Sequence, residues 1–580
     1  MRDLRLHDNP LYHVGDDTSV DPVQCFPVFI FDDHDFAPRP STCRPQHWNA
    51  VHLGPHACRV LLESVQDLQQ SLRHRGGDLF LRTGSTVPVI LQLLQDTQAT
   101  EIVWNEELGI YEQERSQQVL DAITANFPHV TVHTFCDSTL YHPDDLPHGA
   151  EEWERYAHPE RSKQSKKKQN KKQGKTAKSS GNHLFDRHET PGKSSKNNLV
   201  DLAPTRFEGI PPIMGDFRRA ARDKAQVRSC LDTPSSRIDY GTMKNYEMPT
   251  LENLLRPLLC LSDDDNLIMG LPHSLIRQVC HHAIQQHDTD CKDNLYQGIA
   301  HGGETRGLQH LQDFCHHHAA TAQRNLACVD NHQSSRLSHY LTFGCLSPRK
   351  IVKESELQNQ QTNAGDCNWL ISHMTMRDFF LYTCLATGKA FYLRDGIPVN
   401  KKAAKMIVWK DWQNESVQLW HQWATGQTGL PLIDAGLREL TQTGYCSNRV
   451  RQNAASVLTK DLGVDWRAGA EWFQFLLIDH CVGANWGNWL YFSGKGSDPK
   501  HRHFRTVSQA LKYDKDGVYV KMWLPELREL VLSFDSEAYL RPWDFSKEAT
   551  RWKIPIVPPE SQYTLPDLER LRAEGRLINS

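Results

Sequence analysis

The 580-residue sequence lacks the features that mark several protein classes. No stretch approaches the ~18 consecutive apolar residues that a membrane-spanning helix needs. Its 15 cysteines are scattered and none forms a Cys-x-x-Cys pair, which excludes a disulfide scaffold or zinc ribbon and is typical of a reduced, intracellular protein. The net charge is only −4, so no overall basic field indicates nucleic acid, and any such binding must come from a local patch.

Tryptophan, in contrast, is abundant. The chain has 15 tryptophans, and most of them lie in its second half. With 39% hydrophobic and 23% charged residues, the composition predicts a globular protein, and the length is enough for roughly two to four domains. The clustering of large indole side chains therefore requires an explanation beyond composition.

The first 147 residues alternate between β-rich runs and helical patterns, which predicts a doubly wound parallel sheet (Rossmann-like) with helices on both faces. Strands are expected at 24–31, 78–82, 102–104 and 130–135, and helices at 57–75, 87–95 and 111–125. No strand precedes the head segment Arg2-Asp3-Leu4-Arg5. We therefore expect that the first strand is missing from the sequence, so that a targeting peptide and the compartment (nucleus or organelle) cannot be judged from this end.

A long linker and a large helical domain are expected to follow. Residues 148–239 form the linker, which contains a low-complexity insertion at 162–198 with eight lysines between positions 162 and 179. Such a run indicates either a solvated insertion or a nuclear-import or nucleic-acid-binding patch. Residues 240–545 have mostly helical patterns, and 546–580 form a C-terminal tail.

Two segments combine residue types that bind ligands. Ser334-Ser335-Arg336-Leu337-Ser338 places hydroxyls, backbone amides and a guanidinium just before a helical run, an arrangement that holds a pyrophosphate or simply caps the helix. The segment 426–496 predicts an Asp434–Arg438 pair along a helix.

In that same segment, Asn448, Arg451 and Gln452 share one helical face. A buried arginine needs a carboxylate, and Asp479 is the predicted partner of Arg451. Each feature alone is also explained by a structural ion pair or cap, but together they indicate a site.

These motifs resemble the photolyase/cryptochrome superfamily, and within it the cryptochrome DASH group. Matching stretches cover most of the chain outside the lysine-rich insertion. They include Arg2–Asn9, Leu62–Leu68, Thr139–Pro147, Gly302–Thr305, Ser334–Ser338, Met376–Phe380 and the segment 426–496. The resemblance implies an α/β N-terminal domain, a helical FAD-binding domain and chemistry driven by blue light.

The resemblance also implies roles for individual residues. FAD is expected to be bound, with Asn485 facing flavin N5, where an amide can donate or accept a hydrogen bond. Cys481 stands where most relatives have aspartate. The implied cofactor-binding residues are Ser334, Ser335, Arg336, Leu337, Ser338, Trp369, Arg377, Asn448, Arg451, Asp479, Cys481 and Asn485.

Some of the tryptophans acquire a rationale through the resemblance. Trp489 and Trp466 match the first two members of the family's electron-transfer chain, and Trp412 is the predicted third, with Trp409 as the competing choice. The alternative for any single tryptophan is core packing.

The expected DNA side departs from the family pattern. Family photolyases extrude a damaged dinucleotide into a cavity over the flavin, where a glutamate and an aromatic residue contact it. Here His373 and Met376 occupy those positions, and we therefore expect weak dimer repair. Asn448, Arg449, Gln452 and Tyr491 still line the expected cavity and predict salt-sensitive binding to single-stranded DNA.

The sequence contains two further candidate features, an acidic residue for an antenna and two histidine clusters. Glu107 resembles the acidic residue that holds a methenyltetrahydrofolate antenna in relatives, although a glutamate on a βα loop is common. The histidine clusters His281-His282 and His316-His317-His318 are better explained as exposed helix surface than as metal ligands, because adjacent side chains point to different helix faces. No metal site and no membrane association are predicted, and a monomer is expected.

Three functions are consistent with these observations. The first is a blue-light photoreceptor in which a tryptophan chain photoreduces FAD. The second is light-driven repair of cyclobutane pyrimidine dimers in single-stranded DNA. The third, which needs no resemblance, is a helical nucleic-acid-binding protein without flavin.

Overall fold

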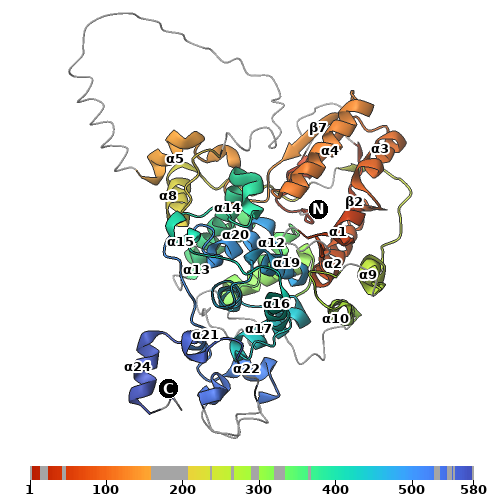
Figure 1. Cartoon of the computed structure of the whole chain (residues 1–580). Coiled ribbons are helices and arrows are strands. Elements are labelled where there is room, and N and C mark those ends of the chain that lie inside the picture. The colour runs from red at the N-terminus through yellow and green to blue at the C-terminus, as the bar shows by residue number, and fades with distance from the viewer. Residues whose placement is uncertain are drawn as a thin grey trace, which may run out of the picture.

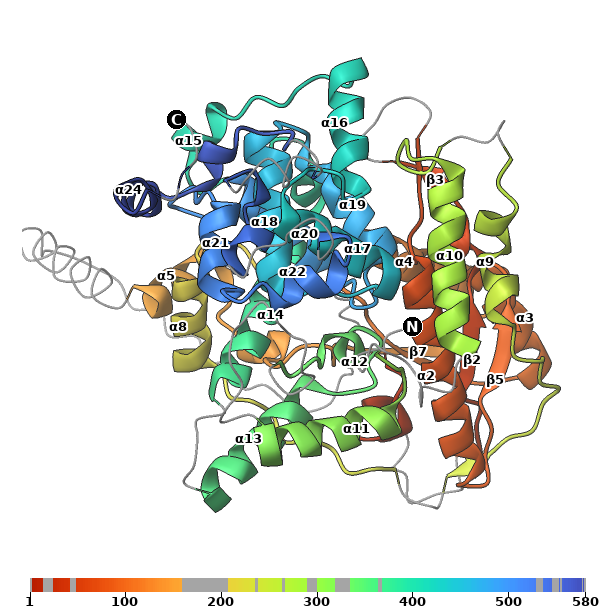
Figure 2. The same ribbon diagram turned by 90° about the horizontal axis from the view of Figure 1, so that it is seen from below.

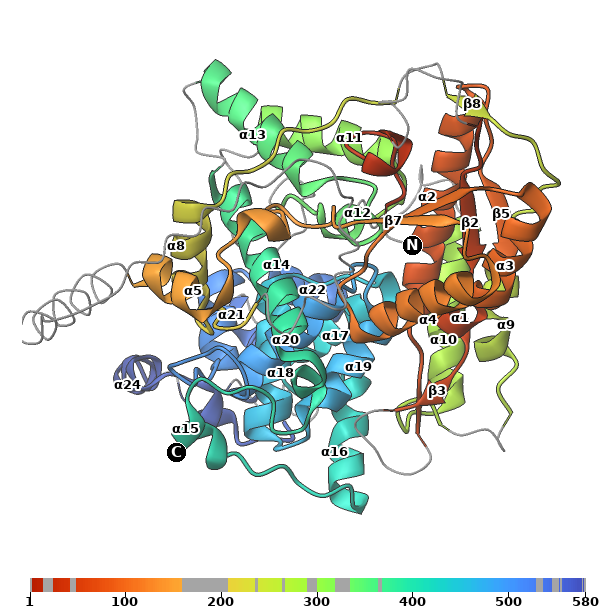
Figure 3. The ribbon, with the colours of Figure 1, turned by 90° about the horizontal axis from the view of Figure 1, so that it is seen from above.

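A computed structural model describes the greater part of the chain. The described residues are 3–13, 24–41, 48–158, 207–234, 238–262, 267–288, 300–318, 334–362, 368–527, 536–544, 552, 555–575 and 577. The lysine-rich insertion 162–198 lies outside these residues. In Figures 2 and 3 the N-terminal strands and helices lie at one side of the molecule and the C-terminal helices at the other.

The N-terminal part contains parallel strands, as the alternating pattern predicts. Strand β2 (Val28–Phe31) pairs in parallel with β5 (Phe80–Thr83), and β6 (Glu101–Asn105) pairs in parallel with β7 (Thr131–Phe135). Within the described residues these remain two separate two-stranded sheets rather than one continuous sheet. The expectation of parallel strands is thus confirmed. Within the described residues, no strand pairing joins the β2–β5 pair to the β6–β7 pair.

Three helices cover the strands at nearly the predicted positions: α2 (Pro55–Arg73), α3 (Thr86–Thr97) and α4 (Ile110–Asn126). The predicted strand 24–31 is split at Pro27 into β1 (Gln24–Cys25) and β2, because proline has no N–H for the ladder. Strand β1 pairs instead with β8 (Asp239–Tyr240).

The linker region contributes helices of its own. Helix α5 (Gly149–Ala157) packs on α8 (Met214–Lys224), where the ring of Trp153 stacks on Phe217 with 5.7 Å between centroids. Helices α9 (Leu251–Leu259) and α10 (His273–Asp288) pack against α2 of the N-terminal part. The domain boundaries given above remain predictions.

The remaining helices form the C-terminal part of the molecule (Figure 1). They are α11 (Glu304–Asp313), α12 (Ser338–Thr342), α13 (Pro348–Thr362), α14 (Asn368–Thr387), α15 (Lys401–Lys405), α16 (Asn414–Ala424), α17 (Pro431–Thr443), α18 (Asn448–Ser456), α19 (Trp466–Leu476), α20 (Val482–Ser493), α21 (Thr506–Tyr513), α22 (Val518–Trp523) and α24 (Leu565–Ala573).

Helices α14, α19 and α20 form the centre of this part, and two glycines allow them to approach closely. A Cβ at Gly469 of α19 would lie 2.2 Å from the indole ring of Trp489, and one at Gly487 of α20 would lie 2.3 Å from the ring of Phe380. Because only glycine leaves room for these rings, the side chains of α20 are held at fixed positions between their neighbours.

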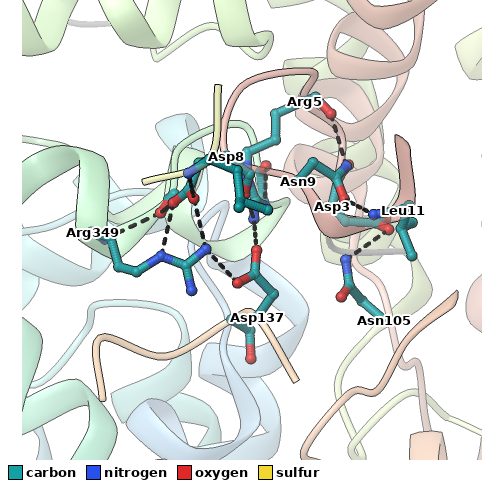
Figure 4. A network of polar contacts seen from close by, with 12 residues as sticks. Asp3, Arg5, Asp8, Asn9, Leu11, Asn105, Asp137 and Arg349 are labelled. Atoms are coloured by element: carbon teal, nitrogen blue, oxygen red, sulfur yellow. Dashed lines mark hydrogen bonds and ion pairs between the residues drawn. The ribbon is translucent and has the colours of Figure 1, made fainter. Parts of the chain in front are cut away.

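A buried polar network joins the two parts of the molecule (Figure 4). Asp137 accepts from Arg5 Nη2 and Arg349 Nη2, both at 2.5 Å, and Arg349 also pairs with Asp8 at 2.7 Å. Arg5 Nη1 donates to the backbone carbonyl of Gly344 at 3.0 Å. The head segment therefore acts as a connector between the N-terminal part and the helices.

Candidate functional site

An arginine–carboxylate pair lies at the centre of the predicted site. Arg451 of α18 donates through Nη1 and Nη2 to the two carboxylate oxygens of Asp479, at 3.1 and 3.0 Å. Ser338, the first residue of α12, donates to the same carboxylate at 2.7 Å. The predicted Arg451–Asp479 pair is thereby confirmed, and it brings together three segments that are far apart in the sequence.

The serine-rich loop lies beside this pair. The guanidinium groups of Arg336 and Arg451 both pack on the ring of Tyr445, at 5.0 and 5.5 Å from its centroid. Arg336 has a positive φ of 45°, and the carbonyl of Ser335 contacts His310 Nε2 at 2.8 Å. Two guanidinium groups and three half-buried serines within one region form a donor set that suits a diphosphate. The sequence-predicted residues therefore fit a flavin dinucleotide, whereas Tyr445 was not predicted.

The sequence reasoning also missed a buried acid, Glu439 of α17. It accepts a hydrogen bond from the hydroxyl of Tyr519, and burial raises the pKa of Glu439 to about 7. Arg336 and Arg451 counteract this rise through their charges. The sequence does not reveal that Glu439 is buried. A single acid between leucines in a helical pattern also fits an exposed position on the helix.

The predicted Asp434–Arg438 pair on α17 is wrong. Asp434 accepts from the backbone N–H groups of Thr428 and Gly429, at 2.7 and 3.0 Å, and so holds the loop before the helix. Arg438 instead forms a bidentate salt bridge with Glu526, with N–O distances of 2.9 and 2.7 Å. A spacing of four residues permits a pair along the helix, but the tertiary structure offered both side chains better partners.

Helix α20 carries two predicted residues one turn apart. The amide of Asn485 is buried and donates through Nδ2 to the carbonyl of Ala470 at 2.9 Å, which leaves Oδ1 as its acceptor. Trp489, four residues later, is also buried. Cys481 is the N-cap residue of α20, and its carbonyl accepts from the N–H of Asn485 at 2.8 Å.

A small cavity lies between the two parts of the molecule. It is lined by Arg377 and Cys481 from the helical part and by Glu106 and Glu107 from the loop after β6. Burial raises the pKa of Glu106. Arg377 is anchored there through a hydrogen bond to the carbonyl of Ser138.

Glu107 also lines a second small cavity. Asp35, His52 and Arg115 share that lining. Although burial disfavours its charge, the carboxylates of Asp35, Glu107 and Glu112 raise the pKa of Arg115. The structure thus places the predicted antenna residue in a charged region between two cavities.

Each of the three predicted electron-transfer tryptophans has a ring contact with another tryptophan. The ring centroid of Trp489 lies 6.0 Å from that of Trp423, Trp466 lies 5.5 Å from Trp486, and Trp412 lies 6.4 Å from Trp420. Across the described ranges, no ring contact of this kind joins Trp466 to Trp489 or to Trp412.

The predicted DNA residues fall into two groups. His373 and Trp369 are neighbours on α14, with ring centroids 5.2 Å apart, and Met376 is half-buried on the same helix. On α18, Asn448 is exposed and Arg449 donates to Gln452 at 3.1 Å while packing 4.3 Å from the ring of Tyr513. The guanidinium of Arg502 lies 5.7 Å from the ring of Tyr491. The second group contains two arginine–tyrosine pairs, Arg449–Tyr513 and Arg502–Tyr491.

Neither a metal site nor a membrane-spanning helix is found among the described residues. Among the described residues, no group of three histidine, cysteine, aspartate or glutamate side chains is placed to hold a metal ion. Likewise, none of the described helices is both long and apolar enough to cross a membrane.

Comparison with known proteins supports a specific family. The model of the DNA photolyase family matches residues 1–175, and the model of the FAD binding domain of DNA photolyase matches residues 369–567. The chain is 30% identical to cryptochrome DASH of Danio rerio over 91% of its own length and 82% of that protein's. It is 29% identical to cryptochrome DASH of Synechocystis over 96% of its length and 91% of that protein's.

Solved structures agree with these matches. A cryptochrome from Synechocystis has a TM-score of 0.71 at 26% identity, covering 99% of this chain and 97% of that one. A class III photolyase from Agrobacterium tumefaciens has a TM-score of 0.66 at 21% identity, covering 99% and 95%; it supports the fold alone.

Proposed function

The chain belongs to the photolyase/cryptochrome superfamily, where it is a cryptochrome DASH-like FAD protein, and from this premise we propose that it is a blue-light photoreceptor whose bound FAD is photoreduced by tryptophan. The observation that carries the proposal is that Asn485 and Trp489 lie one turn apart on α20. This helix packs against α18, which carries Arg451 of the Arg451–Asp479 pair. The amide and the indole are the residues that would hydrogen-bond to a bound flavin and supply its electron.

The residues of the chain have separate tasks in this proposal. Bound FAD supplies the absorption of blue light and accepts the electron. Arg336, Ser334 and Ser335 would hold the diphosphate through charge-assisted hydrogen bonds, while Asp479 fixes the orientation of the Arg451 guanidinium. Asn485 would supply a hydrogen bond at flavin N5, and Cys481 contributes a small side chain at the start of α20.

Illumination of the FAD-loaded protein tests this proposal. Blue light in the presence of a thiol reductant should bleach the absorption of oxidised flavin. Trp489→Phe should slow the bleaching several-fold with unchanged FAD content, because phenylalanine is far harder to oxidise than an indole. Trp472→Phe is the matched control, since Trp472 is equally buried but stacks on Phe475. An unmodified protein that holds FAD and shows no bleaching would contradict the proposal.

Light-driven repair of cyclobutane pyrimidine dimers in single-stranded DNA is the second candidate function. The Arg449–Tyr513 and Arg502–Tyr491 pairs favour it, because bases stack on aromatic rings and guanidinium planes while arginine neutralises phosphate. His373 and Met376 oppose it, since a neutral imidazole offers a single acceptor and methionine stacks poorly. We therefore propose salt-sensitive binding of single-stranded DNA with weak repair.

A repair assay separates the two functions. The reduced protein is illuminated with an oligonucleotide that contains a thymine dimer, and recovery of thymine absorbance is followed. No recovery together with normal photoreduction supports the photoreceptor, and rapid recovery supports repair. Size-exclusion chromatography with light scattering of the same sample tests the proposed monomer.

An antenna site is proposed at the cavity between the two parts. Glu107 and its neighbour Glu106 line this cavity, and burial raises the pKa of Glu106. A methenyltetrahydrofolate bound here would transfer excitation energy to FAD. Loss of its near-ultraviolet absorption from the purified Glu107→Gln protein, with FAD retained, is the expected result.

A further inference from the structure

Apolar side chains are exposed at the outer edge of the helical part. Met406 and Val408 are 80% and 82% exposed, and Leu393 is 58% exposed. All three belong to the segment 393–411, which includes α15. In Figures 2 and 3, α15 lies on the side of the molecule away from the N-terminal strands. Exposed apolar residues that gather in one place indicate an interaction site.

Tertiary contacts hold this segment in place. Lys495 is buried and donates from Nζ to the carbonyl of Ala404 at 3.0 Å. Arg394 Nη2 donates to the carbonyl of Trp409 at 3.4 Å, which brings the two ends of the segment together. The backbone under the apolar side chains is therefore ordered before any partner binds, and little conformational freedom is lost on binding.

Burial alternates along the last part of the segment. Met406 and Val408 are exposed, whereas Ile407 is half-buried and Trp409 is buried. In extended backbone every second side chain lies on the same side, so Met406 and Val408 point outward together. A Cβ at Gly494 would lie 3.2 Å from Cδ1 of Ile407, which shows that the inward side chain packs against the helical part.

Exposed lysines accompany these apolar side chains. Lys401, Lys402 and Lys405 of α15 are all exposed, and Lys405 directly precedes Met406. Within the described part of the chain, the ammonium groups of these three lysines form no ion pair and no hydrogen bond. Their positive charges are therefore available to an anionic partner.

The charge of this segment is opposite to that of the chain as a whole. The segment 393–411 has five basic residues and two acidic ones, whereas the chain has a net charge of −4. Of the two acids, Asp395 lies beside the buried Lys495, with 3.4 Å between its carboxylate and Nζ, and Asp411 is exposed. The unpaired lysines of α15 therefore give this region a local positive charge.

We propose that this region binds the anionic surface of a lipid bilayer. The binding region, which we call the α15 patch, comprises Leu393, Lys401, Lys402, Lys405, Met406 and Val408. On contact, its apolar side chains enter the boundary between headgroups and acyl chains, and its lysines lie against lipid phosphates. The sequence predicts no membrane association, and the α15 patch changes that expectation for peripheral contact, which needs no spanning helix. None of its residues belongs to the flavin site, so the proposal is independent of the proposed photoreception.

The chemistry of the α15 patch favours a bilayer over other anionic partners. Single-stranded DNA binds to aromatic rings on which its bases stack, whereas the apolar members of the patch are methionine, valine and leucine. A protein partner would need an apolar pocket with an acidic rim that matches the protruding side chains. A bilayer accepts protruding apolar side chains without such a pocket, and its negative surface potential attracts lysines.

Cosedimentation of the FAD-loaded protein with lipid vesicles tests the proposal. Vesicles of phosphatidylcholine with phosphatidylserine should bind the protein, and vesicles of phosphatidylcholine alone should not. Combining Met406→Ser with Val408→Ser should weaken binding about tenfold, because two apolar side chains no longer leave water. Lys402→Gln should weaken it about fivefold, and added salt should weaken binding of the unmodified protein.

A matched control separates the α15 patch from other surfaces. Leu565→Ser changes a side chain that is 74% exposed at the start of α24, and this variant should bind vesicles as the unmodified protein does. Every variant retains the lysine-rich insertion 162–198, so full binding by the Met406 and Val408 double variant would assign the contact to charges elsewhere and overturn the proposal. Absence of binding to both kinds of vesicle would also overturn it. FAD content and light-driven bleaching should be the same in all variants.

Hydrogen exchange followed by mass spectrometry locates the contact. Anionic vesicles should slow exchange in peptides that cover residues 401–411 and leave peptides from α24 unchanged. Slower exchange at 401–411 with a single-stranded oligonucleotide, and not with vesicles, would assign the α15 patch to nucleic acid and contradict the proposal.

Discussion

At the residue scale, the function depends on charges that are held in place by burial. The Arg451–Asp479 pair is largely removed from water, with side-chain exposures of 20% and 5%. Burial works against the charge of Arg451, but Asp479 raises the pKa of that guanidinium. The pair fixes the orientation of the Arg451 guanidinium. It also matters for stability, because loss of one member leaves the charge of the other buried and unpaired.

Asp479→Asn is therefore expected to lower both stability and FAD content. The free energy of unfolding, measured by urea denaturation, should fall by on the order of 3 kcal/mol. Glu526→Gln is a matched control, because its two-pronged pair with Arg438 is more exposed, at 40% and 30%, and should change stability by less than about 1 kcal/mol. Equal effects of the two substitutions would contradict a special role for the buried pair.

A second residue-scale prediction concerns pH. Burial raises the pKa of Glu439 to about 7, from an ordinary value of 4.5. The folded state therefore binds this proton more tightly than the unfolded state does, and the contribution of Glu439 to stability, full below pH 4.5, is lost as the pH rises toward 7. Glu439→Gln should remove this loss, so its stability relative to the unmodified protein should increase between pH 5 and 7. A stability difference that is constant over this interval would contradict the prediction.

At the scale of elements, close packing of α19 against α20 determines where the reactive side chains lie. The two helices approach because Gly469 presents no side chain to the ring of Trp489. Asn485 is tied to α19 as well, through the carbonyl of Ala470. The predicted flavin contact and the predicted electron donor are thus both positioned by one helix–helix interface.

Gly469→Ala should disturb this interface. Its Cβ would lie 2.2 Å from Trp489, and overpacking of this kind costs about 1–3 kcal/mol. We expect a lower melting temperature and slower photoreduction, because Trp489 must move. Gly215→Ala on α8 is the control, since its Cβ would meet nothing within 4 Å. Normal photoreduction in Gly469→Ala would show that the position of Trp489 tolerates such a shift.

At the scale of the whole molecule, the head segment and the helical part are joined by the network around Asp137 (Figure 4). The motifs at Met376–Phe380 and Thr139–Pro147 meet in a second connection. Asp378 accepts from the backbone N–H groups of Leu140 and Tyr141, at 3.1 and 2.9 Å, and burial raises the pKa of Asp378 to about 7. These contacts enclose the cavity that contains Glu107.

Asp137→Asn should weaken the junction between the two parts. Arg5 and Arg349 would lose a buried carboxylate, so the free energy of unfolding should decrease by on the order of 3 kcal/mol. Limited proteolysis should also accelerate. Asp145→Asn, which removes a half-buried partner of the exposed Arg228, is the control and should have little effect. Unchanged proteolysis in Asp137→Asn would indicate that apolar contacts alone hold the parts together.

Much of this arrangement could be predicted from the sequence, for identifiable reasons. Periodicity placed the helices 55–73 and 110–126 within about two residues, because an amphipathic helix repeats its apolar face along the chain. The Arg451–Asp479 pair followed from the requirement that a buried guanidinium has a carboxylate. Asp434 and Arg438 were mispaired because a favourable spacing does not exclude better partners elsewhere.

The amino-acid sequence by itself determined the two kinds of architecture, the family and the residue types available to a flavin. Only the tertiary structure decided which of these side chains meet. It brought Ser338, Arg451 and Asp479 into contact and buried Glu439 within reach of the charge of Arg451. It also placed the ring of Trp423 against that of Trp489. The physical reason is that local patterns depend on neighbours within a turn or two, whereas ring contacts and buried ion pairs depend on how distant helices pack.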